Sequence, residues 1–185
     1  IIEDDIDICN MIAKFLEKSN VSNLIKNAKK YGKYKDGLIL IDGKIVEKKG
    51  GGLCHLSNML HYLFLMSPLT VIERHGHKMK SFPDPDKTAK QGIDSTISSG
   101  WLDLKVKNET NNIYQIDIYF DEEYMYGKIL SNKESDVAYV ISNENLRYVR
   151  QNNKIYEIVD IVRAEIDKNT NMQIKKEKLY SEKVE

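Results

Sequence analysis

Two kinds of hydrophobic spacing divide the chain. In the first third, apolar residues recur three and four positions apart, which is typical of amphipathic helices. This spacing predicts helices over residues 7–19 and 22–31 and a central helix over residues 54–66. After Pro68 the pattern changes to an alternation of apolar and polar residues. That alternation predicts antiparallel strands with one buried face.

The strand pattern begins before the central helix and continues to the end of the chain. A hairpin is expected over residues 38–46, turning at Asp42-Gly43. We expect the strands at 102–107 and 114–120 to pair across the turn at 108–112. Other strands are expected at 69–72, 124–130, 138–142, 146–150, 155–166 and 172–180. These elements indicate an α+β fold, in which N-terminal helices and a central cysteine-bearing helix pack on a mostly antiparallel β-sheet.

Length and charge restrict the classes of function. The 185 residues suffice for one domain with a substantial core, which we divide into a helical segment, 1–33, and a main domain, 34–185. With 28 basic and 28 acidic residues, no basic field favours nucleic acid. No apolar run reaches the roughly 20 residues of a membrane span. The chain begins at Ile1, so we expect a fragment: cell-wall facing if a signal or anchor was removed, otherwise cytoplasmic.

The strongest chemical signal is a cysteine at the predicted start of the central helix. Gly50, Gly51 and Gly52 lead through Leu53 into Cys54. Glycines permit left-handed backbone and close approach of another molecule. The first N–H groups of a helix are unpaired and carry partial positive charge, which stabilises a thiolate. Cys54 is therefore a candidate nucleophile, whereas Cys9 is expected to serve packing.

Histidines supply a candidate general base. His75 and His77 follow the predicted strand at 69–72, and an imidazole that meets a thiol in space can take its proton and return it to a leaving group. The helical spacing places His61 too far along the axis from Cys54. His55 points to another side of the helix. The residues alone leave His75 and His77 open, and Arg74 is a candidate for binding a substrate carboxylate.

These residues resemble the VanW family. The resemblance is carried by GGGLCHLSNMLHYLFLMSPLTVIERHGHKMKSFPDP at 50–85, by GIDST at 92–96 and by GWLDLKVKNET at 100–110, and it extends from residue 34 to the C-terminus. It implies an association with vancomycin resistance and with the cell wall. Some VanW-type domains resemble catalytic domains of L,D-transpeptidases, which cross-link peptidoglycan stem peptides through a cysteine thioester.

The resemblance also assigns roles to particular residues. It implies that Cys54 is the nucleophile and that His77, rather than His75, is the base. Asp94 lies in a matching motif and is the candidate for orienting the imidazole, with Asp103 as the alternate. His55 departs from the family, which usually has glutamine there. The resemblance and the polar face of the central helix imply a substrate-binding set of Gly50, Gly51, Gly52, His55, Ser57, Asn58 and Arg74.

Three functions remain open from the sequence. The first is cysteine-dependent acyl transfer or hydrolysis on stem peptides, without a cofactor and with a layout analogous to papain-like and NlpC/P60-like enzymes. The second is a non-catalytic module that binds cell-wall peptides. The third is a metal site, because His75, His77 and Cys54 are suitable ligands for zinc. No second cysteine pair supports that third function, so our prediction names no metal.

Overall fold

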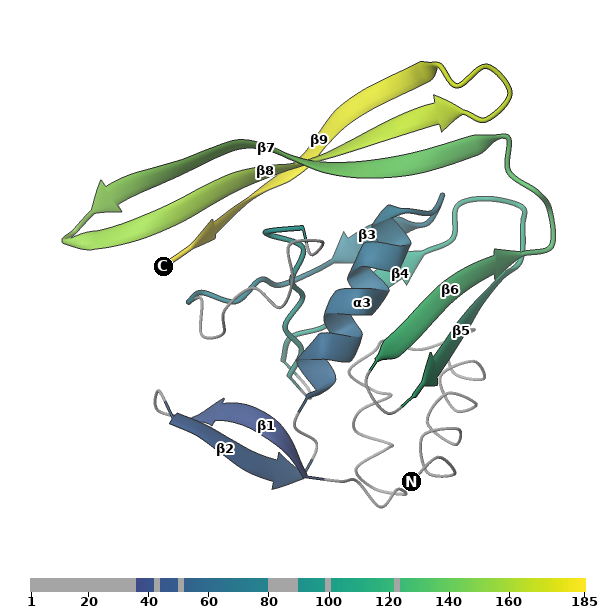
Figure 1. The fold of residues 1–185 in the computed structure, drawn as a ribbon. Helices are drawn as coiled ribbons and strands as arrows, with labels where there is room; N and C mark the ends of the chain where they lie inside the picture. Colours follow the sequence, from purple (N-terminus) through teal and green to yellow (C-terminus); the bar gives the residue numbers. More distant parts are fainter. Residues whose placement is uncertain (1–35, 42–43, 50–51, 80–89, 99–100, 122–123) are drawn as a thin grey trace.

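The computed structural model describes residues 36–41, 44–49, 52–79, 90–98, 101–121 and 124–185. Within these ranges, nine strands accompany one helix, α3 (Leu53–Leu65). Figure 1 shows α3 in the middle of the described part, beside short strands and below a long sheet. The helices expected at 7–19 and 22–31 lie outside the described residues.

The expected α+β class is wrong, because the described part of the chain is mostly β. Its strands also form four separate sheets, three of two strands and one of three, rather than one sheet under the helix. The papain-like layout is therefore wrong as well. The physical reason is that pairing is mostly local: short turns and positive-φ residues return the chain into hairpins.

The first hairpin agrees with the sequence pattern. β1 (Asp36–Ile41) pairs antiparallel with β2 (Lys44–Lys49), and Ile41 is opposite Lys44. The turn at Asp42-Gly43 lies outside the described residues.

The expected pairing of 102–107 with 114–120 is wrong. β4 (Lys105–Lys107) instead pairs with β3 (Thr70–Glu73). β5 (Tyr114–Phe120) pairs with β6 (Met125–Ser131). In the turn between β4 and β5, the Asn108 side chain accepts a hydrogen bond from the Thr110 backbone N–H and donates one to the Asn112 carbonyl. Alternation fixes which face of a strand is buried, but it does not choose the partner strand.

The C-terminal sheet has the order β7-β8-β9, with β7 (Val137–Gln151), β8 (Lys154–Asp167) and β9 (Gln173–Val184). Figure 1 shows these three long antiparallel strands spanning the top of the view. The two strands expected at 138–142 and 146–150 are one strand, β7, whose register shifts where Asn145 has a φ of 53°. Asn152 and Asn153 also have positive φ, which suits the tight turn into β8.

Both ends of α3 follow from local sequence. The residue before the helix, Gly52, has a φ of 81°, a left-handed conformation that favours glycine. At the other end, the Ser67 hydroxyl donates to the Phe64 carbonyl at 2.8 Å and accepts from the Leu69 backbone N–H at 3.2 Å. Pro68 then prevents continuation of the helix. Because α3 begins at Leu53, the thiol of Cys54 lies in the first turn of the helix.

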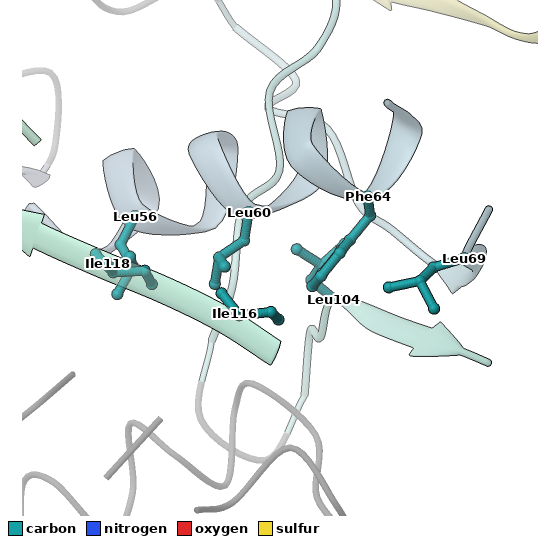
Figure 2. Close-up of a cluster of buried hydrophobic side chains, with 7 residues drawn as sticks. All are labelled: Leu56, Leu60, Phe64, Leu69, Leu104, Ile116 and Ile118. Atoms are coloured by element: carbon teal, nitrogen blue, oxygen red, sulfur yellow. The ribbon is translucent and has the colours of Figure 1, made fainter. Parts of the chain in front are cut away.

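Two hydrophobic clusters fix α3 in place. Figure 2 shows the first cluster, in which one face of α3 packs on side chains from β5 and from the residues beside β3 and β4; its members are Leu56, Leu60, Phe64, Leu69, Leu104, Ile116 and Ile118. The second cluster joins the end of α3 to the C-terminal sheet, through Leu65, Ile93, Ile141, Val159 and Ile161. The segment that carries Ile93 is thus held between α3 and the C-terminal sheet. Among the described residues, no helix is long and apolar enough to cross a membrane.

Candidate functional site

Cys54 lies in the first turn of α3, directly after Gly52 and Leu53. Its thiol is half-buried, and Sγ lies 3.8 Å from the Thr96 hydroxyl. No side chain caps this end of the helix. The backbone dipoles at the N-terminus therefore act on the thiol directly. Of the three glycines before it, Gly50 and Gly51 lie outside the described residues.

His77 and Asp94 meet from two different segments. His77 lies four residues after the end of β3, and Asp94 lies in the segment 90–98. The ring Nδ1 of His77 donates to Asp94 Oδ2 at 2.5 Å, and the backbone N–H of His77 donates to the same oxygen at 2.7 Å. The second ring nitrogen, Nε2, is then left for the thiol, and the His77 side chain hydrogen-bonds Cys54.

The charges of this group reinforce one another. The hydrogen bond with His77 lowers the pKa of the Cys54 thiol, and the Ile97 backbone and Thr96 hydroxyl lower it further, against the effect of burial. Hydrogen bonds with Asp94 and Cys54 raise the pKa of His77 to about 10. Burial acts to raise the pKa of Asp94, but the bonds from His77 and the charge of Arg74 lower it overall. Both shifts favour the ion pair of a thiolate and an imidazolium over the neutral pair.

Arg74 is held by the protein on all sides of its guanidinium. Nε donates to the Asp94 carbonyl at 2.7 Å, and Nη2 donates to Asp94 Oδ1 at 2.9 Å. Nη1 is paired with Glu182. Burial acts to lower the pKa of Arg74, but the hydrogen bond with Glu182 and the neighbouring charges raise it overall. These contacts make Arg74 a support for Asp94, a role that the sequence did not suggest.

A row of polar contacts joins α3 to the segment that carries Asp94. The Ser57 hydroxyl donates to the Ser95 hydroxyl at 3.1 Å, and both residues are fully buried. The Asn58 side-chain oxygen accepts from the Ser95 backbone N–H at 2.6 Å. The sequence predicts that Ser57 and Asn58 bind substrate. Their side chains instead hydrogen-bond to Ser95, next to Asp94, and so hold this segment against the helix that carries Cys54.

The remaining histidines lie in different surroundings. His55 is exposed on α3. His75 is paired with Glu73, at 3.0 Å between Nε2 and Oε1. His61 is buried, and its Nδ1 donates to the Ile93 carbonyl at 3.1 Å. Burial lowers the pKa of His61 to about 4, so this ring is neutral at physiological pH.

Metal ligation finds no support in the described ranges. Within them, no three histidine, cysteine, aspartate or glutamate side chains are grouped so that they could hold a metal ion. His75 faces Glu73, whereas Cys54 and His77 are joined to each other. The three residues of the zinc hypothesis therefore do not converge on one point: His75 pairs with Glu73, and Cys54 pairs with His77.

Three residues near the site were missed by the sequence prediction. Thr96 contacts the thiol, and its backbone N–H donates to the His75 carbonyl at 2.7 Å. Glu182 and Tyr180 contact Arg74 from β9. Thr96 lies two residues after Asp94 and could have been suspected. The two β9 residues carry no local signal, because their partners lie about a hundred positions away along the chain.

Large parts of this chain are similar to known proteins. A family model described as VanW like protein matches residues 8–130. The vancomycin B-type resistance protein VanW of Enterococcus faecalis (strain ATCC 700802 / V583) is 41% identical over 160 residues, which are 86% of this chain and 58% of that protein. The uncharacterized protein YoaR of Bacillus subtilis (strain 168) is 31% identical over 78 residues, which are 42% of this chain and 24% of that protein.

The matches cover a larger share of this chain than of either relative. The chain spans less than two thirds of the length of either relative. No solved structure matches the chain. The family model, however, covers well over half of the 185 residues, and it includes Cys54, His77 and Asp94. The chain belongs to the family of VanW-like proteins.

Proposed function

We propose that this chain is a cysteine-dependent acyl-transfer enzyme that acts on peptidoglycan stem peptides. The observation that carries the proposal is the contact of a thiol of lowered pKa with His77, whose other ring nitrogen is held by Asp94. In this assignment Cys54 is the nucleophile and His77 the general acid and base. Asp94 and Arg74 are positioning residues, because they act through the imidazole.

The first half of the reaction forms a thioester. The Cys54 thiolate attacks the carbonyl carbon of a peptide bond and forms a carbon–sulfur bond. The carbon–nitrogen bond then breaks, and the leaving amine takes the proton of the His77 imidazolium. Asp94 holds Nδ1–H at 2.5 Å throughout, so the ring keeps the tautomer that directs Nε2 to the sulfur.

The second half releases the enzyme. An amine from a second stem peptide, or a water molecule, attacks the thioester carbonyl while His77 accepts its proton. The carbon–sulfur bond breaks and the thiolate returns beside the imidazolium. An amine acceptor gives a cross-link, which is transpeptidation, whereas water gives hydrolysis. Both outcomes use the same residues, so the acceptor decides the reaction type.

The substrate class rests on the relatives. The relative from Enterococcus faecalis is named for vancomycin resistance, which implies a relation to the cell wall. Stem peptides are the part of the wall that offers both a carbonyl to a nucleophile and an amine acceptor. The family match includes the segment that carries Cys54, His77 and Asp94.

The test is to incubate the protein with purified muropeptides and to record the intact mass. We expect a covalent adduct or a new peptide product with the wild type, and neither with Cys54→Ala. His77→Ala should reduce the rate of adduct formation at least about a hundredfold, the usual contribution of a general acid or base. His75→Ala is the matched control, because that neighbouring ring pairs with Glu73.

The opposite result would identify a binding module. If the wild type forms neither an adduct nor a product, while Cys54→Ala still binds muropeptides with unchanged affinity, acyl transfer is excluded. The chain would then be a non-catalytic cell-wall peptide-binding domain.

A further inference from the structure

A buried carboxylate lies behind the candidate site. Glu182 lies near the end of β9 and is 8% exposed. It pairs with Arg74, whose side chain is 11% exposed. The same guanidinium donates to Asp94 through Nε and Nη2. Arg74 therefore lies between two carboxylates, one of which holds the imidazole of His77.

Two glycines make room for Glu182. A Cβ added at Gly76 would overlap Glu182 Oε1 and would lie 2.8 Å from Arg74 Nη2. A Cβ added at Gly92 would lie 3.0 Å from the Glu182 Cβ and 2.8 Å from Val159 Cγ1. Gly76 precedes His77, and Gly92 lies two residues before Asp94. Both segments that supply the candidate site are thus shaped to receive the Glu182 side chain.

Other contacts tie the same strand to the same segments. The Tyr180 hydroxyl donates to the Gly92 carbonyl at 3.0 Å, and its ring lies 4.7 Å from the Arg74 guanidinium carbon. The Glu185 backbone N–H donates to the Lys78 carbonyl at 3.1 Å. Figure 1 shows the end of β9 running down towards this part of the molecule. The family model ends at residue 130, so none of these β9 residues lies within its match.

We propose that Glu182 is a positioning residue of the candidate site: it holds Arg74 against Asp94, and Asp94 in turn directs His77 at Cys54. The catalytic meaning of this inference rests on the proposed function. The C-terminal sheet is then part of the site and not a separate appendage.

In their ionised forms these side chains alternate in charge, from Glu182 through Arg74, Asp94 and His77 to Cys54. Burial raises the pKa of the Glu182 carboxyl, while its hydrogen bond with Arg74 acts to lower that pKa. Without the Glu182 charge, Asp94 alone would balance Arg74. Asp94 would then hold the His77 proton less strongly, and the thiolate would lose part of its imidazolium partner. The measurable consequence is a less reactive thiol near neutral pH, because the thiolate is the nucleophilic form.

The test measures thiol reactivity without any peptide substrate. Alkylation by iodoacetamide is followed by intact mass from pH 5 to pH 9, in a Cys9→Ala background so that only Cys54 reacts. We expect Glu182→Gln to slow alkylation at pH 7 by roughly tenfold, the change in thiolate fraction that one pKa unit produces. Glu177→Gln is the matched control, because Glu177 lies on the same strand and pairs with Arg163 at 2.8 Å. That control should react like the wild type.

A second variant separates positioning from folding. Gly76→Ala keeps every charged group but displaces the Glu182 carboxylate and Arg74 Nη2, which are both ends of flexible side chains, and so disturbs the pairing of these two groups. It should slow alkylation in the same direction as Glu182→Gln, and it decides the question if Glu182→Gln does not fold by circular dichroism. A purely structural role would lower the melting temperature of both variants and leave their pH profiles unchanged, which would overturn the inference.

The two proposals fail in different ways. Unchanged alkylation profiles in Glu182→Gln and Gly76→Ala, with a wild-type adduct on muropeptides, would overturn the positioning role and keep acyl transfer. Shifted profiles without any wild-type adduct or product would support the positioning of the thiol–imidazole pair and remove acyl transfer as its purpose.

Discussion

His77 donates two hydrogen bonds to a single oxygen of Asp94, one from its backbone N–H at 2.7 Å and one from ring Nδ1 at 2.5 Å. The other carboxylate oxygen accepts from Arg74 at 2.9 Å. One side chain thereby fixes both the path of the chain at His77 and the direction of its ring. The carboxylate is consequently the part of the site whose removal has the clearest expected effect.

Asp94→Asn should lower the pKa of His77 from about 10 towards its ordinary value of 6.5, because the amide carries no charge. Thiol alkylation at pH 7 should slow about tenfold in consequence. The ring protons of His77, followed by NMR titration, measure the first effect directly. Asp117→Asn is the control, since that exposed carboxylate pairs with Lys128. A His77 titration identical to that of the wild type would contradict this electrostatic account.

The contribution of His77 to stability should depend on pH with a definite sign. Its pKa is raised in the folded state, so the stabilisation is complete below the ordinary value of 6.5 and is lost as the pH rises through about 10. Urea unfolding of wild type and His77→Gln should differ by the order of 1 kcal/mol at pH 6 and converge at pH 10. This magnitude is kept small because the side chain is 41% exposed and water screens the pair. A difference that grows with pH would refute the assignment.

Asn58→Ala should destabilise the protein by about 1–3 kcal/mol, because the Ser95 backbone N–H would lose an acceptor that now lies 2.6 Å away. Chemical denaturation gives the free energy of unfolding. Asn111→Ala provides a comparison at an exposed position and should change this free energy by less than about 0.5 kcal/mol. Equal effects of the two substitutions would mean that the α3 contact adds nothing to stability.

Leu60→Ala should cost about 2–5 kcal/mol of unfolding free energy, because Leu60 is 1% exposed in the cluster between α3 and β5. The same substitution at Leu130, which is 43% exposed, should cost much less. The midpoint of urea unfolding with an unchanged m-value is the readout. A small loss at Leu60 would show that α3 does not depend on this cluster.

Much of the local structure was predictable from the sequence. The apolar spacing of the central helix and the glycines before Cys54 place the thiol correctly in the first turn of α3. The alternation of apolar and polar residues identifies most strands, because half-buried strands leave a period of two. The pairing of Cys54, His77 and Asp94 in space agrees with the candidates named from the residues and the family resemblance, while their chemical roles stay predictions.

Other features could not be read from local patterns. The partner of β4 is β3, and no periodicity distinguishes it from the expected pairing with β5. The interpretation of Arg74 as a substrate ligand relied on its chemistry, whereas the structure gives that guanidinium two carboxylates of the chain itself. In the sequence, Glu182 is one of several charged residues in a polar terminal strand, so nothing predicts that it is buried. It is buried because β9 packs against the segments that contain Gly76 and Gly92.

The pairing of Arg74 with Glu182 joins residues that are 108 positions apart. A contact of that separation closes a long loop, whose entropy must be lost before the contact is gained. During synthesis, Cys54, His77 and Asp94 emerge well before β9 exists. If Glu182 positions Arg74 as proposed, we expect the thiol to acquire its full set of contacts late in folding, and a chain shortened before β9 to carry a less reactive cysteine than the folded protein.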